Sequence, residues 1–218
     1  FAARREKEIL SITKNIIGRT DWDRHVAMIL APQAKYHIGN EILRDEFYHV
    51  VWSKKHFEDK FTIVSTISTG NFKGLEVVLK TANCLKELGF NFKWIVIGQD
   101  ESSTYASMVS KWLNLSYYEN NVQLVGRKNA SQLIELLLKA DVYCQVSHIE
   151  NSPNSVCEAM LLGMPIVASL AGGTNSIIEH LEEGYLLQDG DSFALAGTLI
   201  DVSRNFEMAR IWGEKARK

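Results

Sequence analysis

The sequence predicts an α/β fold in which helices cover both faces of a parallel β-sheet. From residue 61 onward, short β-branched apolar runs alternate with helical patterns of about 8–16 residues. Such alternation is typical of βαβ units, whose parallel strands are buried on both faces. Polar, glycine-containing turns follow several of these strands, at the edge where open α/β sheets bind ligands. We therefore expect a Rossmann-like sheet, preceded by an N-terminal segment that is mostly helical.

Three parts are expected along the chain. Residues 1–60 lack regular strand–helix alternation, and the texture changes near Lys60. In this first part the pattern predicts helices at 2–15, 22–30 and 39–57, a short strand at 16–19, and Asp21 as a helix cap. Residues 61–203 form the alternating domain, and residues 204–218 form a closing charged helix.

The elements of the second part follow one another in a regular order. Strands are predicted at 61–68, 92–98, 122–126, 141–147, 165–170 and 185–187. Helices are predicted at 74–89, 102–115, 131–140, 154–163, 174–182 and 192–204.

Composition restricts the kind of protein. The 218 residues carry 24 basic and 26 acidic side chains, without the basic excess of a nucleic-acid-binding surface. No apolar run approaches the roughly 20 residues of a membrane span, and the charged start is not a secretory signal. The three cysteines are odd in number and widely spaced, so we expect reduced residues of a cytoplasmic protein. Because the chain lacks an initiator Met, we expect a fragment.

Two glutamates bracket the most informative turn. Glu150 and Glu158 are separated by seven residues, and Pro153 fits the start of a helix. Backbone amides from about residue 154, at Asn154, Ser155 and Val156, would then be free to bind a phosphate. Glu158 could accept hydrogen bonds from a ribose, and Glu150 from a sugar. The alternative is that Ser155 and Glu158 form a capping box, the commoner use of this spacing.

Three further turns lie at the same predicted edge. Gly70 permits a close backbone approach, and Lys73 offers a positive charge to a phosphate. Gly126 and Arg127 follow the third strand, where they could border a base. Gly172, Gly173 and Thr174 form a tight turn. An ordinary solvated turn is the simpler interpretation of each one alone, but their convergence favours a binding site.

Other kinds of site find little support. The six histidines show no metal-ligand spacing, and there is no GxSxG nucleophile elbow. We expect no metal and no cofactor. His148 lies beside Glu150, but a histidine at the end of a strand is more often structural.

The order of these motifs resembles the C-terminal, nucleotide-sugar-binding half of GT-B glycosyltransferases, in particular the retaining family-4 group. The residues that carry the resemblance are FTIVSTISTGNFKGLEVVL, WIVIG, VQLVGRKNASQLIELLLKADVYCQVS, ENSPNSVCEAMLLGMPIVAS and AGGTNSIIEHLEEGYLLQDGD. The resemblance covers residues 61–203, and residues 1–60 resemble the remnant and linker of that family's N-terminal domain.

The resemblance implies a role for each site residue. Lys73 would pair with the donor diphosphate and Glu150 would contact the donor sugar, so these two would be catalytic. Glu158 would hold the ribose, while Gly70, Asn154, Ser155 and Val156 would surround the phosphates. Gly126 and Arg127 would border the base. This chain departs from the family at Ile67-Ser68, where the family usually has a Gly-Arg pair whose arginine also binds phosphate. Half of that phosphate clamp is therefore absent, or is supplied from elsewhere, for example by Arg127.

The resemblance also implies a reaction and its partners. The full enzyme would move a sugar from a nucleoside-diphosphate sugar to a glycan or lipid-linked glycan, in polysaccharide or glycoconjugate synthesis, with peripheral association at the inner membrane face. This chain would bind nucleotide without turnover, because most of the N-terminal domain is missing. Two alternatives remain, a nucleotide-sugar epimerase of the same fold and a non-catalytic nucleotide-binding or assembly module.

Overall fold

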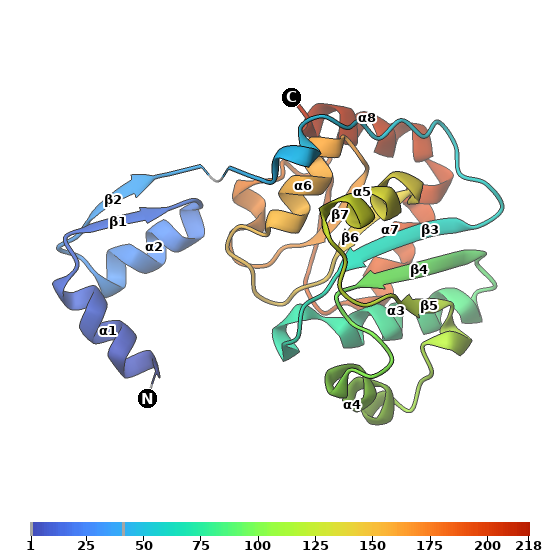
Figure 1. Cartoon of the computed structure of the whole chain (residues 1–218), viewed down its shortest axis with the longest axis horizontal. Helices are drawn as coiled ribbons and strands as arrows, with labels where there is room; N and C mark the ends of the chain where they lie inside the picture. Colours follow the sequence, from blue (N-terminus) through green and yellow to red (C-terminus); the bar gives the residue numbers. More distant parts are fainter. Residues whose placement is uncertain (1, 41) are drawn as a thin grey trace.

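The computed structural model describes residues 2–40 and 42–218, which form a smaller and a larger lobe joined by an extended linker (Figure 1). The smaller lobe contains α1 (Ala2–Ile12), β1 (Asn15–Gly18), α2 (Asp21–Leu30) and β2 (Lys35–Ile38). Its two strands pair in parallel, from Asn15 opposite Lys35 to Gly18 opposite Ile38.

The larger lobe alternates strands and helices along its whole length. Its strands are β3 (Phe61–Thr66), β4 (Phe92–Ile97), β5 (Val122–Leu124), β6 (Val142–Gln145), β7 (Ile166–Ser169) and β8 (Tyr185–Leu187). Its α-helices are α3 (Leu75–Glu87), α4 (Thr104–Leu113), α5 (Ala130–Lys139), α6 (Asn154–Leu162), α7 (Ser192–Arg204) and α8 (Phe206–Ala216). Short 3₁₀ turns are η1 (Asp45–Phe47), η2 (Asn71–Lys73), η3 (Tyr118–Asn120) and η4 (Thr174–Ser176).

The six strands of the larger lobe form one parallel sheet in the order β5-β4-β3-β6-β7-β8. The chain first builds the sheet outward from β3 and then returns to add β6 on the other side. The connections after β3 and β6 therefore leave the same edge in opposite directions, which opens a crevice between them. This arrangement confirms the α/β fold with a Rossmann-like parallel sheet.

Helices bury the sheet on both faces. On one face α3 packs against α4 and α7, and on the other α5 and α6 pack against η1 (Figure 1). The core between these layers contains Phe61, Trp94 and Tyr143, each at most 1% exposed. No helix in the described part of the chain combines the length and the apolar character needed to cross a membrane.

The linker is the largest difference from the predicted elements. Residues 39–57 were expected to be helical, but among those that the structure describes, 39–40 and 42–57, only η1 is helical. The aromatic residues pack singly on the larger lobe instead: Phe47 is fully buried, and Trp52 Nε1 donates to the Ala140 carbonyl at 2.8 Å. The spacing of these aromatic residues along the chain resembles that of one face of a helix. In the structure, however, they lie on an extended segment and contact the surface of the larger lobe.

Three smaller predictions also differ from the structure. Strand β2 was not predicted. Thr20, and not Asp21, caps α2, because Thr20 and Asp23 form a reciprocal capping box. The helix expected at 174–182 is limited to η4, and Leu181 adopts a left-handed backbone (φ 66°) that a helix cannot continue through.

Candidate functional site

Lys73 and Glu150 meet at the crevice between β3 and β6. Lys73 ends η2, which follows β3, and Glu150 lies in the loop after β6. Lys73 Nζ lies 2.5 Å from Glu150 Oε1, which also accepts a hydrogen bond from Ser147 Oγ at 2.8 Å. Both side chains are largely buried, at 20% and 15% exposure. The topology thus brings together two residues that the sequence separates by 77 positions.

Glycines determine how closely the Lys73 turn approaches β6. Gly70 has φ 152°, outside the range that L side chains favour. Gly74 is left-handed at φ 74°, and a Cβ there would lie 2.0 Å from the Val146 carbonyl oxygen. The backbone N–H of His148 donates to the Phe72 carbonyl at 2.8 Å. The turn therefore lies directly against the end of the neighbouring strand.

A second pair of glycines holds the Glu150 loop from the other side. The Gly173 N–H donates to the Glu150 carbonyl at 2.9 Å, and a Cβ on Gly172 would lie 2.0 Å from that same oxygen. A Cβ on Gly173 would contact the Asn151 carbonyl at 2.3 Å and Thr20 at 2.6 Å. The Gly-Gly turn therefore positions Glu150 by close backbone contact.

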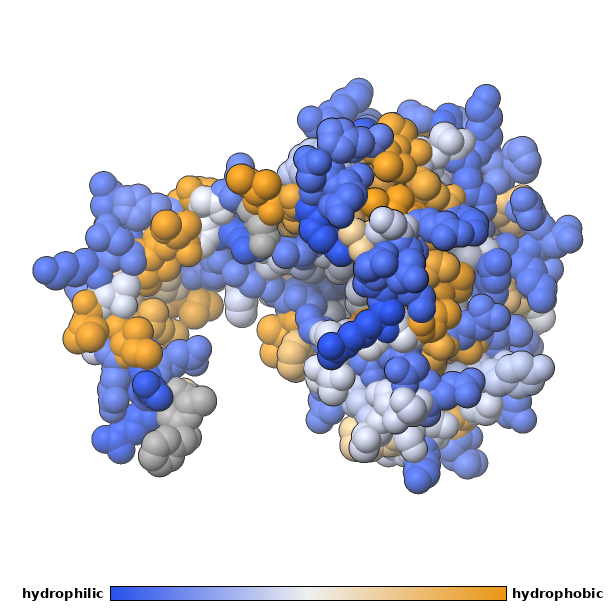
Figure 2. Space-filling model, viewed as in Figure 1, coloured by the Kyte–Doolittle hydropathy of each residue, from blue (hydrophilic) through white to orange (hydrophobic). Residues whose placement is uncertain are grey.

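The smaller lobe closes one side of the site. A cavity of about 560 Å³ lies between the ends of β1 and β2 and the loop after β6, in the region where Figure 2 shows a hollow between the lobes. Its lining residues are Ile17, Gly18, Arg19, Asp23, Gly39, Asn40, Glu150, Asn151 and Ser152. Polar contacts join the lobes here: Thr20 Oγ1 donates to Asn151 Oδ1 at 2.5 Å, and Asn151 Nδ2 donates to Asp23 Oδ2 at 2.7 Å.

The first turn of α6 begins two residues after Ser152, the last residue that lines this cavity. Asn154 is exposed, and its Oδ1 accepts a hydrogen bond from Arg19 Nη1 at 3.3 Å. Ser155 is half-buried. Val156 is fully buried, and its N–H already donates to the Pro153 carbonyl at 2.9 Å. Of the three amide positions expected to bind phosphate, Val156 is therefore the least available.

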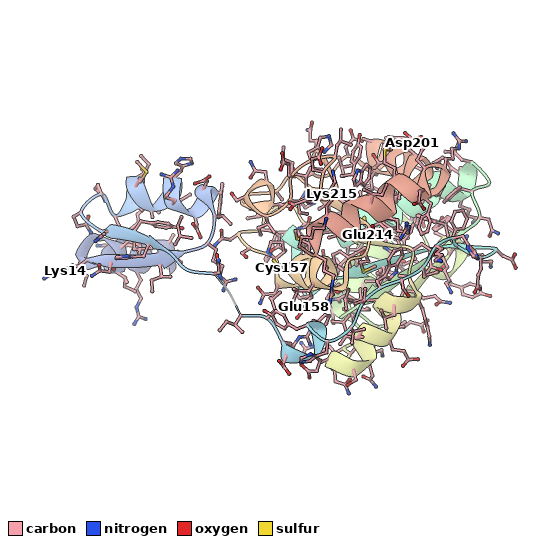
Figure 3. All side chains as sticks on the ribbon, turned by 90° about the horizontal axis from the view of Figure 1, so that it is seen from above. Lys14, Cys157, Glu158, Asp201, Glu214 and Lys215 are labelled. Atoms are coloured by element: carbon pink, nitrogen blue, oxygen red, sulfur yellow. The ribbon has the colours of Figure 1, made fainter. Side chains whose placement is uncertain are left out.

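Glu158 has a partner that the sequence did not suggest. Both of its carboxylate oxygens accept hydrogen bonds from Arg44, at 2.7 Å from Nε and 2.8 Å from Nη2. This carboxylate is one cause that raises the pKa of Arg44. Figure 3 labels Glu158 on α6, on the side of the linker that carries η1. The alternative of a Ser155–Glu158 capping box is wrong, because Pro153 is the N-cap and makes no side-chain cap.

Gly126 and Arg127 lie farther along the sheet. They follow β5, the edge strand, two positions from β3. Gly126 is held by bonds to the loop after β4, its N–H donating to the Gln99 carbonyl at 2.7 Å. Arg127 is exposed. In the part of the chain that the structure describes, no hydrogen bond or ion pair joins Arg127 to the Lys73–Glu150 pair.

His148 bridges two carboxylates beside the site. Its Nε2 lies 2.6 Å from Glu76 Oε1 and its Nδ1 lies 3.1 Å from Asp189 Oδ2. Burial alone would lower the pKa of His148, but these hydrogen bonds raise it above its ordinary value. His148 thereby ties the start of α3 to the loop that precedes α7. In the described chain, outside residues 1 and 41, no group of three or more His, Cys, Asp or Glu side chains could hold a metal ion.

Sequence reasoning missed the residues that reach the site from the smaller lobe and the linker. Arg44 and Glu158 are 114 positions apart, and Arg19 and Asn154 are 135 apart. No local pattern links such residues, because only the folding of the linker over α6 brings them together. The sequence signal for these contacts was limited to the presence of Arg19 and Arg44 in two polar segments.

Comparison with known proteins gives a consistent result. A family model described as "Glycosyl transferases group 1" matches residues 50–218. The amylovoran biosynthesis glycosyltransferase AmsK of Erwinia amylovora is 30% identical over 148 residues, which cover 65% of this chain and 36% of that protein. The chain thus spans less than half the length of this curated relative.

Two solved structures share the fold. The structure titled "Crystal Structure of TarM" superposes with a TM-score of 0.80 at 20% identity, covering 98% of this chain and 42% of that one. Anabaena Alr3699/HepE, solved in complex with UDP and glucose, superposes with a TM-score of 0.73 at 18% identity, covering 94% and 57%.

Proposed function

We propose that this chain, which belongs to the group 1 family of glycosyl transferases, binds the sugar donor in an enzyme that moves a sugar from a nucleoside-diphosphate sugar to an acceptor hydroxyl. The observation that carries the proposal is the Lys73–Glu150 pair, which lies at the crevice between the two central strands and whose glutamate lines the polar cavity. A crevice of this kind is the usual ligand site of an open α/β sheet.

The two residues have complementary roles in the proposed reaction. The ammonium of Lys73 has three N–H donors, and Glu150 engages one of them, so the others can bind a diphosphate. Positive charge at this point stabilises the diphosphate as the bond to the sugar breaks. Glu150, a carboxylate fixed by Ser147 and Lys73, can accept hydrogen bonds from sugar hydroxyls.

Glu158 is proposed to bind the ribose, with Arg44 orienting its carboxylate. The bidentate pair occupies one lone-pair position on each oxygen, which leaves acceptor capacity for a ribose hydroxyl. Because Glu158 is only 5% exposed, the ribose would have to displace part of the Arg44 side chain, which is 42% exposed. Replacement of Glu158 by glutamine should abolish any preference for UDP over its 2′,3′-dideoxy analogue.

The smaller lobe supports the proposal that residues 1–60 comprise part of an acceptor-binding N-terminal domain and the linker that follows it. Parallel sheets are normally buried on both faces, yet Ile17 and Ile38 on its two strands are 76% and 73% exposed. Helix α2 contains no buried residue. These apolar surfaces suit further packing against that domain.

The finer features of the reaction are also proposed. They are family-4 membership, retention at the anomeric carbon, no metal, a glycan or lipid-linked glycan acceptor, and a cytoplasmic enzyme at the inner membrane face. The name of the relative AmsK, which refers to amylovoran biosynthesis, supports a role in polysaccharide synthesis. NMR of the product would report its anomeric configuration.

Calorimetry with UDP, GDP and ADP tests the donor-binding proposal. We expect one of them to bind, with unchanged affinity in EDTA, and UDP is the first choice because Alr3699/HepE was solved with it. Lys73→Ala should weaken binding at least about 10-fold, the usual loss for a bond between charged partners. Lys86→Ala is the matched control, since Lys86 is an exposed lysine at the far end of α3. Absence of binding to all three diphosphates would refute the proposal.

A further inference from the structure

A buried tyrosine lies at the junction of β3, β6 and α6. Tyr143 of β6 pairs with Val64 of β3, and Thr66, two residues farther along β3, points to the same face of the sheet. Helix α6 packs against β6 and carries Ser155 in its first turn. The hydroxyl groups of Ser155 and Thr66 both act on the pKa of Tyr143, so these hydroxyl groups are neighbours.

The hydroxyl of Tyr143 is buried without a well-formed hydrogen bond. Tyr143 is 1% exposed, and in the part of the chain that the structure describes neither its hydroxyl nor that of Thr66 has a hydrogen-bond partner at ordinary length and angle. Burial raises the pKa of Tyr143 to about 12, so the phenol keeps its proton at neutral pH. Buried tyrosine hydroxyls usually find a partner, because leaving one without a partner lowers stability. Packing alone does not explain this hydroxyl, since phenylalanine would pack equally well.

Ser155 connects the buried hydroxyl with the proposed position of the phosphates. It is half-buried in the first turn of α6, where the unpaired backbone N–H groups of a helix favour an anion. A phosphate accepts hydrogen bonds, so a serine that binds it must donate its single hydroxyl proton. The serine oxygen then remains as an acceptor for a second donor. The protonated phenol of Tyr143 can be that donor, and its oxygen can in turn accept from Thr66.

We propose that Tyr143 is a positioning residue of the donor site, whose hydroxyl donates to Ser155 Oγ and orients the Ser155 hydroxyl toward the diphosphate. The inference rests on the donor-binding function proposed above and deepens it. Hydrogen bonds in series strengthen one another, because each polarises the next. Tyr143 would therefore raise the affinity for the diphosphate without touching it.

Calorimetry on the full chain tests the inference with a diphosphate and its nucleoside. The diphosphate is UDP, or GDP or ADP if one of these is the one that binds. Tyr143→Phe should weaken diphosphate binding about 5-fold, the usual loss for a hydrogen bond between neutral groups, and leave nucleoside binding within about 2-fold. Ser155→Ala should weaken diphosphate binding about 10-fold, because it removes a hydrogen bond to a charged group.

A double variant tests whether the two hydroxyls act as a unit. Tyr143→Phe combined with Ser155→Ala should bind the diphosphate as Ser155→Ala alone does, because no Ser155 hydroxyl is left to orient. Tyr143→Phe should also keep or raise the urea midpoint, since it removes a buried hydroxyl without a partner. A purely structural hydroxyl would give the opposite pair of results, a lower midpoint and an unchanged Kd.

Tyr117→Phe is the matched control. Tyr117 is half-buried in the same lobe, and its hydroxyl donates to the Ala106 carbonyl of α4 at 3.1 Å. Loss of this hydroxyl should lower the urea midpoint and leave the diphosphate Kd unchanged.

Several results would overturn the inference. They are an unchanged diphosphate Kd in Tyr143→Phe or in Ser155→Ala, losses that add in the double variant, and an equal loss of affinity for the nucleoside. Each of these leaves the donor-binding proposal intact. Failure of the unaltered chain to bind any of the three diphosphates would overturn both proposals. The urea transition of each variant verifies that the protein is folded.

Discussion

Arg44 and Glu158 form an ion pair whose two members differ in exposure. We therefore expect replacement of each one to lower the free energy of unfolding by a different amount. The Glu158 side chain is 7% exposed, whereas Arg44 is 42% exposed. Arg44→Met leaves a buried carboxylate without its cation, so it should destabilise the fold by about 2–4 kcal/mol. Glu158→Gln leaves a partly hydrated guanidinium and should cost about 1–2 kcal/mol.

Urea denaturation measures both costs, and the double variant should lose less than the sum of the two. Arg210→Met is the control, because Arg210 pairs with two exposed glutamates on α8 and should cost less than about 1 kcal/mol. Equal costs for Arg44→Met and Arg210→Met would contradict the structural account of the pair.

His148 gives the molecule a predictable dependence on pH. Burial alone would lower its pKa, but the hydrogen bonds to Glu76 and Asp189 raise the pKa in the folded state. A raised pKa means that folding favours the protonated ring. The resulting stability is complete below the unfolded pKa of about 6.5 and is lost as pH rises through the higher folded value.

Replacement of His148 by glutamine removes this contribution. The difference in free energy of unfolding between the wild type and the variant should therefore shrink as pH rises from 6 to about 9. Urea denaturation at a series of pH values measures it, with His56→Gln, at an exposed linker position, as the control. If the difference in free energy of unfolding between the wild type and His148→Gln stayed constant or grew with pH, the proposed role of His148 would be contradicted.

At the scale of elements, two left-handed glycines flank α3. Replacing each by alanine distinguishes the loss of stability caused by a steric clash from the loss caused by backbone conformation alone. Gly74 and Gly89 have similar φ values of 74° and 69°. A Cβ on Gly74 would lie 2.0 Å from the Val146 carbonyl oxygen, whereas a Cβ on Gly89 meets nothing within 4 Å. Gly89→Ala should therefore cost about 1–2 kcal/mol for the left-handed backbone alone.

Gly74→Ala should cost clearly more, about 3 kcal/mol or above, because the turn must also move away from β6. It should weaken nucleotide binding as well, since Lys73 precedes it. Urea denaturation and calorimetry measure the two effects. Similar costs for both alanine variants would show that the turn can relax without losing the contact.

At the scale of the whole molecule, Arg217 joins three distant segments. Its Nη1 donates to the Val50 carbonyl in the linker at 2.9 Å and to the Leu161 carbonyl at the end of α6. Arg217→Met would leave these carbonyls without their donor and should destabilise the larger lobe by about 1–3 kcal/mol. The urea midpoint measures the loss, and Lys218→Met at the exposed terminus should have no effect. A midpoint unchanged in both variants would exclude this role.

The contact between the lobes is polar, while the core lies within the larger lobe. Bonds through Thr20, Asn151 and Ser176 join the lobes, and these are contacts that water can replace at small cost. The site therefore combines a rigid part, on the sheet edge, with a part whose position depends on weaker contacts.

The sequence by itself determined the elements of the larger lobe. Period-2 and period-3.6 apolar patterns are local, so strands such as β3 and β4 and helices such as α3 and α7 could be predicted from neighbouring residues. The turn residues Lys73 and Glu150 were also found locally, because polar residues follow apolar strands. The same local logic failed at residues 39–57, where the apolar spacing reflects an extended segment on a surface and not a helix.

Only the tertiary structure decided which of these residues act together. Lys73 and Glu150 meet because β3 and β6 are neighbours in the sheet, a fact of strand order that no local pattern contains. Arg44 reaches Glu158, and Arg19 reaches the cavity, because the linker folds back across α6. The physical reason is that ion pairs and hydrogen bonds depend on distance in space, whereas periodicity reports only distance along the chain.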